Sequence, residues 1–144
     1  MSKLEEYLDR NESLTYWNRG RSMLPLIREG KDLVTVEKKG DGQRFKRFDV
    51  VLYRKNGKLI LHRIIKVRKA DYVIMGDNTY RPETGISDDI ILGKMTVFER
   101  NGMRRTVRDP IYLVYVYLWW FFFPIRWIAN VFANCSRRIL KKVF

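Results

Sequence analysis

Short runs of hydrophobic and β-branched residues follow one another from residue 33 to residue 98, separated by glycine, asparagine and charged residues. The runs cover residues 33–36, 48–53, 59–67, 72–75 and 90–98. Runs of this length with such boundaries are typical of β-strands. Asn56-Gly57 lies between the second and third runs, and this dipeptide predicts a two-residue β-hairpin. Asn101-Gly102 repeats the signal before a basic run. The pattern predicts a mainly β fold with an antiparallel sheet.

The two ends of the chain follow other patterns. Residues 2–10 predict a short N-terminal helix, because Leu4, Tyr7 and Leu8 fall on one helical face. These first residues hold no apolar segment, so no cleavable signal peptide is expected. After residue 109 the chain becomes strongly hydrophobic, and residues 111–125 contain no charged residue. We therefore expect a domain of residues 1–109, followed by a hydrophobic, aromatic tail of residues 110–144 with a basic C-terminus.

The tail is expected to associate with a membrane. A helix over residues 111–125 would span about 22 Å, less than the roughly 30 Å hydrocarbon core. A helix that continues to residue 133 would take in Pro124, Arg126 and Asn130. The many Trp and Tyr residues favour the headgroup region. Two arrangements stay open, a kinked C-terminal membrane helix and a helix lying in the interface. The third, a buried core helix, is disfavoured because a small β domain can hardly cover so many aromatic side chains.

Charge narrows the class of partner. The chain has 29 Lys and Arg against 16 Asp and Glu, a formal net charge of +13. Such a balance suits an anionic partner, either a nucleic acid or an acidic membrane. The basic residues are scattered, no nucleic-acid-binding motif is present, and the aromatic residues gather in the tail. We therefore expect a membrane lipid surface and no nucleic acid. The single cysteine, Cys135, excludes an internal disulfide, and no metal or cofactor is expected.

Three polar residues stand in segments suited to catalysis. Ser22 lies in Gly-Arg-Ser-Met-Leu-Pro, residues 20–25, where glycine and proline predict a constrained turn that can expose a hydroxyl. His62, the only histidine, lies in an apolar strand, and imidazole is the usual base near neutral pH. Asp77 begins a turn after the run at 72–75. Each residue alone also fits an ordinary structural role. Together they supply the three groups of a Ser–His–Asp triad, which is defined by geometry.

These segments resemble the signal peptidases and the related self-cleaving SOS-repressor proteases, over residues 20–94. The serine box is residues 20–25, and Gly-Lys-Asp follows at 30–32. The strand box is Phe-Asp-Val-Val-Leu-Tyr at 48–53, and the base box is Leu-His-Arg-Ile at 61–64. Gly-Asp-Asn stands at 76–78, and Ile-Leu-Gly-Lys at 91–94 resembles the last strand of the family.

The resemblance implies a small signal-peptidase-like β domain with Ser22 as nucleophile and His62 as general base. Bacterial housekeeping signal peptidases and SOS repressors have a lysine at the position of His62, whereas the endoplasmic-reticulum and archaeal type has a histidine. The chain therefore resembles the Ser–His branch, in which an acidic residue supports the imidazole. Asp77 is the predicted acid. The second acid of that branch has no aspartate counterpart here, so Glu83 and the Asp88-Asp89 pair stay open as alternatives.

The predicted function is a membrane-associated serine endopeptidase that cleaves signal or leader peptides, with a peptide or preprotein as substrate. A self-cleaving regulator fits less well, because only about 19 residues precede the serine box and no Ala-Gly cleavage site is present. Two further alternatives are an inactive relative that only binds peptides and a basic nucleic-acid-binding module. Basic residues flank the tail on both sides, so the membrane face of the catalytic domain stays open. The oligomeric state stays open as well.

Overall fold

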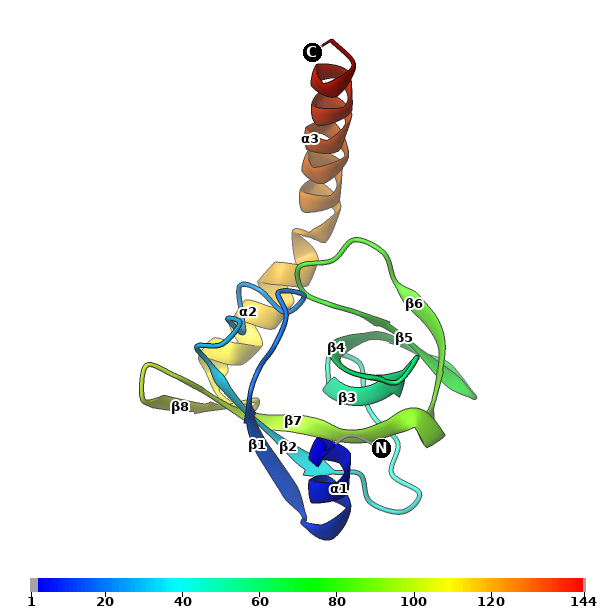
Figure 1. The fold of residues 1–144 in the computed structure, drawn as a ribbon, viewed down its shortest axis with the longest axis vertical. Helices are drawn as coiled ribbons and strands as arrows, with labels where there is room; N and C mark the ends of the chain where they lie inside the picture. Colours follow the sequence, from blue (N-terminus) through cyan, green and yellow to red (C-terminus); the bar gives the residue numbers. More distant parts are fainter. Residues whose placement is uncertain (1–2, 144) are drawn as a thin grey trace. The chain divides into compact units, whose positions relative to one another are not determined.

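The computed structural model describes the backbone of residues 3–143 and the side chains of residues 3–137. Within these residues, eight strands form one antiparallel sheet in the order β1-β2-β7-β3-β4-β5-β6, with β8 paired to β7. The strands are β1 (Ser13–Trp17), β2 (Leu33–Lys38), β3 (Val50–Lys55), β4 (Lys58–Val67), β5 (Asp71–Met75), β6 (Glu83–Ser87), β7 (Ile91–Arg100) and β8 (Met103–Thr106). β7 runs between β2 and β3, through the middle of the sheet (Figure 1). The expected mainly β, antiparallel architecture is confirmed.

Both predicted hairpins are present. Asn56 and Gly57 have φ angles of 51° and 72°, and Asn101 and Gly102 have 52° and 75°. Two successive positive φ angles define the type I′ turn, which matches the twist of the flanking strands. The first turn joins β3 to β4, and the second joins β7 to β8.

The expected N-terminal helix is α1 (Lys3–Arg10), and Ser2 lies outside the described residues. Leu8 is its buried hydrophobic residue. Buried Glu5 adds an ion pair, since its Oε1 lies 3.5 Å from Nη1 of Arg54 on β3. A buried hydrophobic side chain and an ion pair therefore hold α1 in place.

The buried core follows from the two-residue period of the strands. Alternate side chains of β3, β4 and β5 point to one face, where they form a cluster of buried residues. Its members are Phe45, Val51, Tyr53, Ile64, Tyr72, Ile74, Ile86 and Ile91. Tyr53 and Tyr72 bring hydroxyl groups into this otherwise apolar cluster, and both hydroxyls are hydrogen-bonded.

Two strands were not expected from the sequence. In β1 only Leu14 is buried, and Tyr16 is half-buried. In β6 only Ile86 is buried, and Gly85 interrupts the run. Each strand lies at one end of the main strand order and packs on one neighbour, β2 and β5 respectively. Edge strands therefore carry too few hydrophobic residues here to be recognised from the sequence pattern.

The C-terminal part contains two helices where one was expected, α2 (Pro110–Phe121) and α3 (Phe123–Val143). The chain divides at residues 109 and 110 into two compact units, and both helices belong to the second. In the described residues no single helix is long and apolar enough to cross a membrane. α2 together with residues 123–137 meets that criterion by length and composition, with a bend of 54° between the two helices.

Candidate active site

The β3–β4 hairpin places His62 beside two polar residues of the neighbouring strand. The two-residue turn pairs Lys55 with Lys58, Tyr53 with Ile60 and Val51 with His62. Directly paired residues share a face of the sheet, and so do residues two apart along one strand. Tyr53, Lys55 and His62 therefore lie on the same face.

A carboxylate from another strand completes this group. Glu83 opens β6, and its Oε1 lies 3.3 Å from Nδ1 of His62. The Tyr53 hydroxyl donates to the same Oε1 at 2.9 Å and lies 3.2 Å from Nδ1. Lys55 Nζ lies 2.6 Å from the other oxygen, Oε2. One carboxylate thus connects the imidazole with a phenol and an ammonium group.

The surroundings set the charge of both partners. Burial lowers the pKa of His62 below its usual 6.5, although attraction to Glu83 and Asp77 acts in the opposite direction. For Glu83, burial alone would raise the pKa, but hydrogen bonds from Lys55 and Tyr53 outweigh it and lower the pKa below 4.5. At neutral pH, Glu83 is therefore ionised and His62 is mainly neutral, as a general base must be.

Ser22 lies next to Gly76, as does the Cδ2 atom of His62. A Cβ atom built on Gly76 would lie 3.0 Å from Cβ of Ser22 and 3.1 Å from Cδ2 of His62. Both side chains therefore reach the same point above the glycine. The turn that holds Gly76 is also bonded to the serine box, because Asn78 N donates to Ser22 O at 2.7 Å and Asn78 Nδ2 donates to Arg21 O at 3.2 Å.

The orientation of the ring suits proton transfer to Nε2. In imidazole, Cδ2 is bonded to Nε2 and lies across the ring from Nδ1. With Nδ1 beside Tyr53 and Glu83, the Cδ2 edge that faces Ser22 carries Nε2. Among the described residues, no hydrogen bond joins Ser22 Oγ to His62, and catalytic hydrogen bonds are often long before substrate binds.

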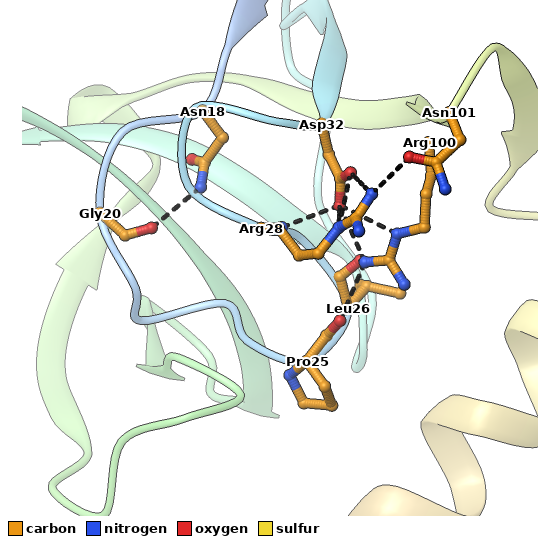
Figure 2. Close-up of polar contacts among 8 residues, drawn as sticks. All are labelled: Asn18, Gly20, Pro25, Leu26, Arg28, Asp32, Arg100 and Asn101. Atoms are coloured by element: carbon orange, nitrogen blue, oxygen red, sulfur yellow. Dashed lines mark hydrogen bonds and ion pairs between the residues drawn. The ribbon is translucent and has the colours of Figure 1, made fainter.

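A buried aspartate holds the loop that carries Ser22 (Figure 2). Asp32 Oδ1 accepts from Arg28 Nη2 at 2.8 Å, and Oδ2 accepts from Arg100 Nη2 at 2.8 Å and from the Arg28 amide at 2.8 Å. Burial alone would raise the pKa of Asp32, but the hydrogen bonds from Arg28 and Arg100 outweigh it and lower the pKa. The two arginines and the carboxylate thus connect the loop to β7.

The same network reaches the residues next to the serine box. Arg100 Nη2 donates to the carbonyls of Pro25 at 3.0 Å and Leu26 at 2.6 Å (Figure 2). Asn18 Nδ2 donates to Gly20 O at 3.2 Å, and Gly20 N donates to Glu29 Oε1 at 2.9 Å. Gly20 has a φ of 103°, which favours glycine, so the sharp entry to the serine box depends on this residue.

Asp77, the acid predicted from the sequence, lies in a buried ion pair with its neighbour in the base box. Its Oδ1 and Oδ2 accept from Nε and Nη2 of Arg63, each at 2.8 Å, and both side chains are fully buried. Arg63 Nη1 also donates to Phe48 O at 3.0 Å. The carboxylate also attracts a proton on His62 at longer range. The prediction that Asp77 supports the imidazole stays a prediction, since the carboxylate beside Nδ1 is that of Glu83.

Asp88, one of the other alternative acids, lies in a different group. Asp88 accepts from the Tyr72 hydroxyl at 2.8 Å and from Arg44 Nη1 at 2.6 Å. Lys39 Nζ lies 3.5 Å from the same carboxylate. Tyr53 and Lys55 were not predicted as site residues, although the hairpin signal at Asn56-Gly57 already places both on the face of His62.

A groove of about 500 Å³ lies next to these strands. It is lined by Lys3, Leu4, Tyr16, Trp17, Asn18, Arg19, Leu52, Leu59 and Leu61. Most of these side chains are apolar or aromatic, which suits an apolar ligand side chain. Arg19 directly precedes the serine box, whereas Leu52, Leu59 and Leu61 lie on the face of the β3–β4 hairpin opposite to His62.

No model of a known protein family matches the chain, and no curated protein is found that is similar to it. The candidate function therefore depends on the residues of the site and their geometry.

Proposed function

We propose that the protein is a membrane-associated serine endopeptidase of the Ser–His signal-peptidase type. One observation carries the proposal: Ser22 and His62 lie against the same glycine, while Glu83 and Tyr53 hold the opposite ring nitrogen. This arrangement supplies a nucleophile, a base and a group that orients the base, which are the roles of a catalytic triad.

The reaction would proceed in two halves. Ser22 Oγ attacks the peptide carbonyl carbon and forms a C–O bond, while its proton passes to Nε2 of His62. The tetrahedral intermediate then collapses, the C–N bond breaks, and Nε2 returns the proton to the leaving amine. Water repeats the sequence on the resulting ester, which releases the second peptide product and restores the Ser22 hydroxyl.

Glu83 and Tyr53 act through the imidazole and are positioning residues in this proposal. A negative carboxylate near Nδ1 stabilises the imidazolium that forms during attack, and it favours the tautomer with the proton on Nδ1. Burial lowers the pKa of His62 most, and repulsion by Lys55 adds to this effect, so the ring is unprotonated and available as a base at neutral pH.

The oxyanion would be stabilised by backbone N–H groups of the serine box. The amide of Ser22 itself is suited to this role, because a nucleophile on a tight turn directs its own N–H toward the carbonyl oxygen under attack. Such a donor contributes about 3–4 kcal/mol to transition-state stabilisation. The network around Asp32 would keep this backbone fixed during the reaction.

The apolar groove suits a hydrophobic segment of a peptide. Signal and leader peptides have this character, and the hydrophobic tail would hold the peptidase at the membrane where such substrates are found. Signal and leader peptides thus fit both the groove in the first unit and the hydrophobic tail.

The test is cleavage of fluorogenic leader peptides with an Ala-x-Ala site by the full chain in phosphatidylcholine–phosphatidylglycerol vesicles. We expect wild type to cleave, and Ser22→Ala and His62→Ala to lose activity by a factor on the order of 10⁴ or more. Ser87→Ala, a serine at the end of β6, is the control and should cleave like wild type. Absence of cleavage by wild type, or equal cleavage by all four proteins, would refute the proposal.

A further inference from the structure

α2 is apolar on every side but short. Its 12 residues from Pro110 to Phe121 contain no charged side chain, and Phe121 is 75% exposed. Further exposed hydrophobic residues are Ile111, Leu113, Val114, Tyr117 and Leu118. Soluble proteins rarely expose a contiguous apolar surface of this kind. A helix of this length measures about 18 Å, which is close to one leaflet and well short of the roughly 30 Å hydrocarbon core.

α3 has a polar stripe along one side. Arg126, Asn130, Asn134 and Arg137 follow at spacings of four, four and three residues, which place them on one helical face. Asn134 Nδ2 donates to Asn130 Oδ1 at 3.3 Å, as expected for side chains on the same face. The opposite face carries Ile125, Ile128, Phe132 and Cys135. An amphipathic helix of this type lies in the plane of the interface with its apolar face in the acyl region.

The junction between the helices keeps them at an angle. Pro124 has no N–H, so it cannot donate to the carbonyl four residues earlier, and helices bend at such positions. Arg126 folds back on α2, where its Nη2 donates to Trp119 O at 2.9 Å and its guanidinium lies 3.6 Å from the centre of the Trp119 ring. Pro124 and the contacts of Arg126 with Trp119 therefore both support the 54° bend between the helices.

We infer that residues 110–144 anchor the protein in one leaflet of an anionic membrane: α2 enters the leaflet and α3 lies in its surface. The inference rests on the membrane association in the proposed function and is independent of the peptidase chemistry. Anionic lipid is the occupant that charge favours, because this segment contains five Lys and Arg and no Asp or Glu. The peptidase unit and the C-terminus would then lie on the same side of the membrane.

The first measurement determines on which side of the membrane the C-terminus lies. The full chain with a C-terminal epitope is added to preformed vesicles, either of phosphatidylcholine alone or with an equal part of phosphatidylglycerol. We expect tighter binding to the vesicles that contain phosphatidylglycerol, and complete removal of the epitope by protease added outside. A protected epitope would mean that the helices span the bilayer and would overturn the inference. Failure to bind either kind of vesicle would overturn the inference too. This holds also if the chain forms a dimer in solution and does not bind lipid for that reason.

The only cysteine gives a second measurement. Cys135 belongs to the apolar face of α3 and is exposed in the free protein. A bilayer-impermeant maleimide should therefore label this thiol in solution, and most of the labelling should disappear when the protein is bound to vesicles. The matched variant, Cys135→Ser with Asn134→Cys, presents a thiol on the polar face and should stay labelled from outside. Equal labelling of both thiols on vesicles would contradict an in-plane helix.

A third measurement tests whether the polar stripe keeps α3 at the membrane surface. Substitution of Arg126, Asn130 and Asn134 by leucine removes the described polar groups that keep the first half of α3 at the surface. We expect this variant to span and to protect the epitope, whereas Ser136→Ala should leave it accessible. If the triple variant is as accessible as wild type, the stripe does not set the topology. Ser22→Ala should match wild type in all three assays, so loss of cleavage and loss of the inferred topology are separate outcomes.

Discussion

Glu83 Oε1 lies 3.3 Å from Nδ1 of His62, although the two residues come from strands that are not neighbours in the sheet. Lys55 binds the other oxygen of this carboxylate. Glu83 therefore attracts a proton on the imidazole, whereas Lys55 repels it. Burial lowers the pKa of His62 most, and the balance between these two charges shifts it further.

Substitutions of Glu83 and Lys55 should therefore shift the pH dependence in opposite directions. The acid limb of kcat/KM reports protonation of His62 in the free enzyme and should lie below pH 6.5 in wild type, because burial lowers the pKa. Glu83→Gln removes an attraction that raises the pKa of His62, so the acid limb moves to lower pH and kcat also falls. Lys55→Met removes a repulsion, so the limb moves to higher pH.

The measurement is peptide cleavage between pH 4.5 and 9, in steps of about half a unit to resolve shifts of order one unit. Arg54→Met, next to Lys55 but on the other face of β3, is the control and should leave the limb in place. Shifts in the same direction for both variants would show that Glu83 does not act on His62 as proposed.

Gly76→Ala should slow cleavage by a factor on the order of 10². The added Cβ would lie 2.6 Å from Ser22 O and close to both Ser22 Cβ and His62 Cδ2, so the two side chains must separate. A displacement of about 1 Å in a reacting group can cost on the order of 10²-fold in rate. Cleavage per folded molecule is compared with that of Gly40→Ala, where the added Cβ meets only Gln43 Oε1 at 3.7 Å. Full activity of the Gly76 variant would mean that the serine and the histidine do not react across this point.

Asp77 should matter more for stability than for orienting the base. Asp77→Asn leaves the buried guanidinium of Arg63 without its full counter-charge, and breaking such a pair costs about 3–5 kcal/mol in the free energy of unfolding. The double variant Arg63→Met with Asp77→Leu should recover most of that loss, because it removes both charges. Denaturant unfolding measures the change. If folded Asp77→Asn loses kcat as completely as His62→Ala while Glu83→Gln retains it, Asp77 is the orienting acid after all.

Asp32 should make the serine loop sensitive to acid. Its pKa is lowered in the folded protein, so its contribution to stability is complete above the unfolded value of about 4 and disappears as pH falls through the folded value. Asp32→Asn should therefore unfold more easily than wild type at pH 7, and the difference should shrink toward pH 2. Thermal unfolding at several pH values measures it. Asp41→Asn, an exposed aspartate, is the control, and a constant difference across this range would contradict the prediction.

The sequence predicted the parts of the sheet that have a strong local pattern. Five hydrophobic runs and two Asn-Gly turns correspond to β2 to β5, β7 and both hairpins. β1 and β6 could not be recognised, because each buries a single side chain completely and gains its structure by pairing with a neighbour. Pro124 and Arg126 did indicate a kink in the tail, but not that the helix would divide there.

The candidate site was predictable only where its contacts are local. Tyr53 and Lys55 follow from the register of a two-residue hairpin and were accessible from the sequence. Glu83 reaches His62 through the pairing of β5 with β6, whose register shifts between Tyr72 and Ile74. Such an irregularity has no sequence signal here, so the choice between Glu83 and Asp77 needed the three-dimensional arrangement. The pairing of Asp77 with Arg63 likewise joins residues 14 positions apart.

The turn at Asn56-Gly57 limits how this protein can change over evolution. Asn56 is exposed and Gly57 has no side chain, so the identity of both residues could drift wherever positive φ angles are tolerated. Its length could not. One inserted or deleted residue would move every later side chain of β4 to the other face of the sheet, and the imidazole would point away from both Ser22 and Glu83. We therefore expect homologous chains to differ in the residues of this turn and to keep the number of residues between Tyr53 and His62.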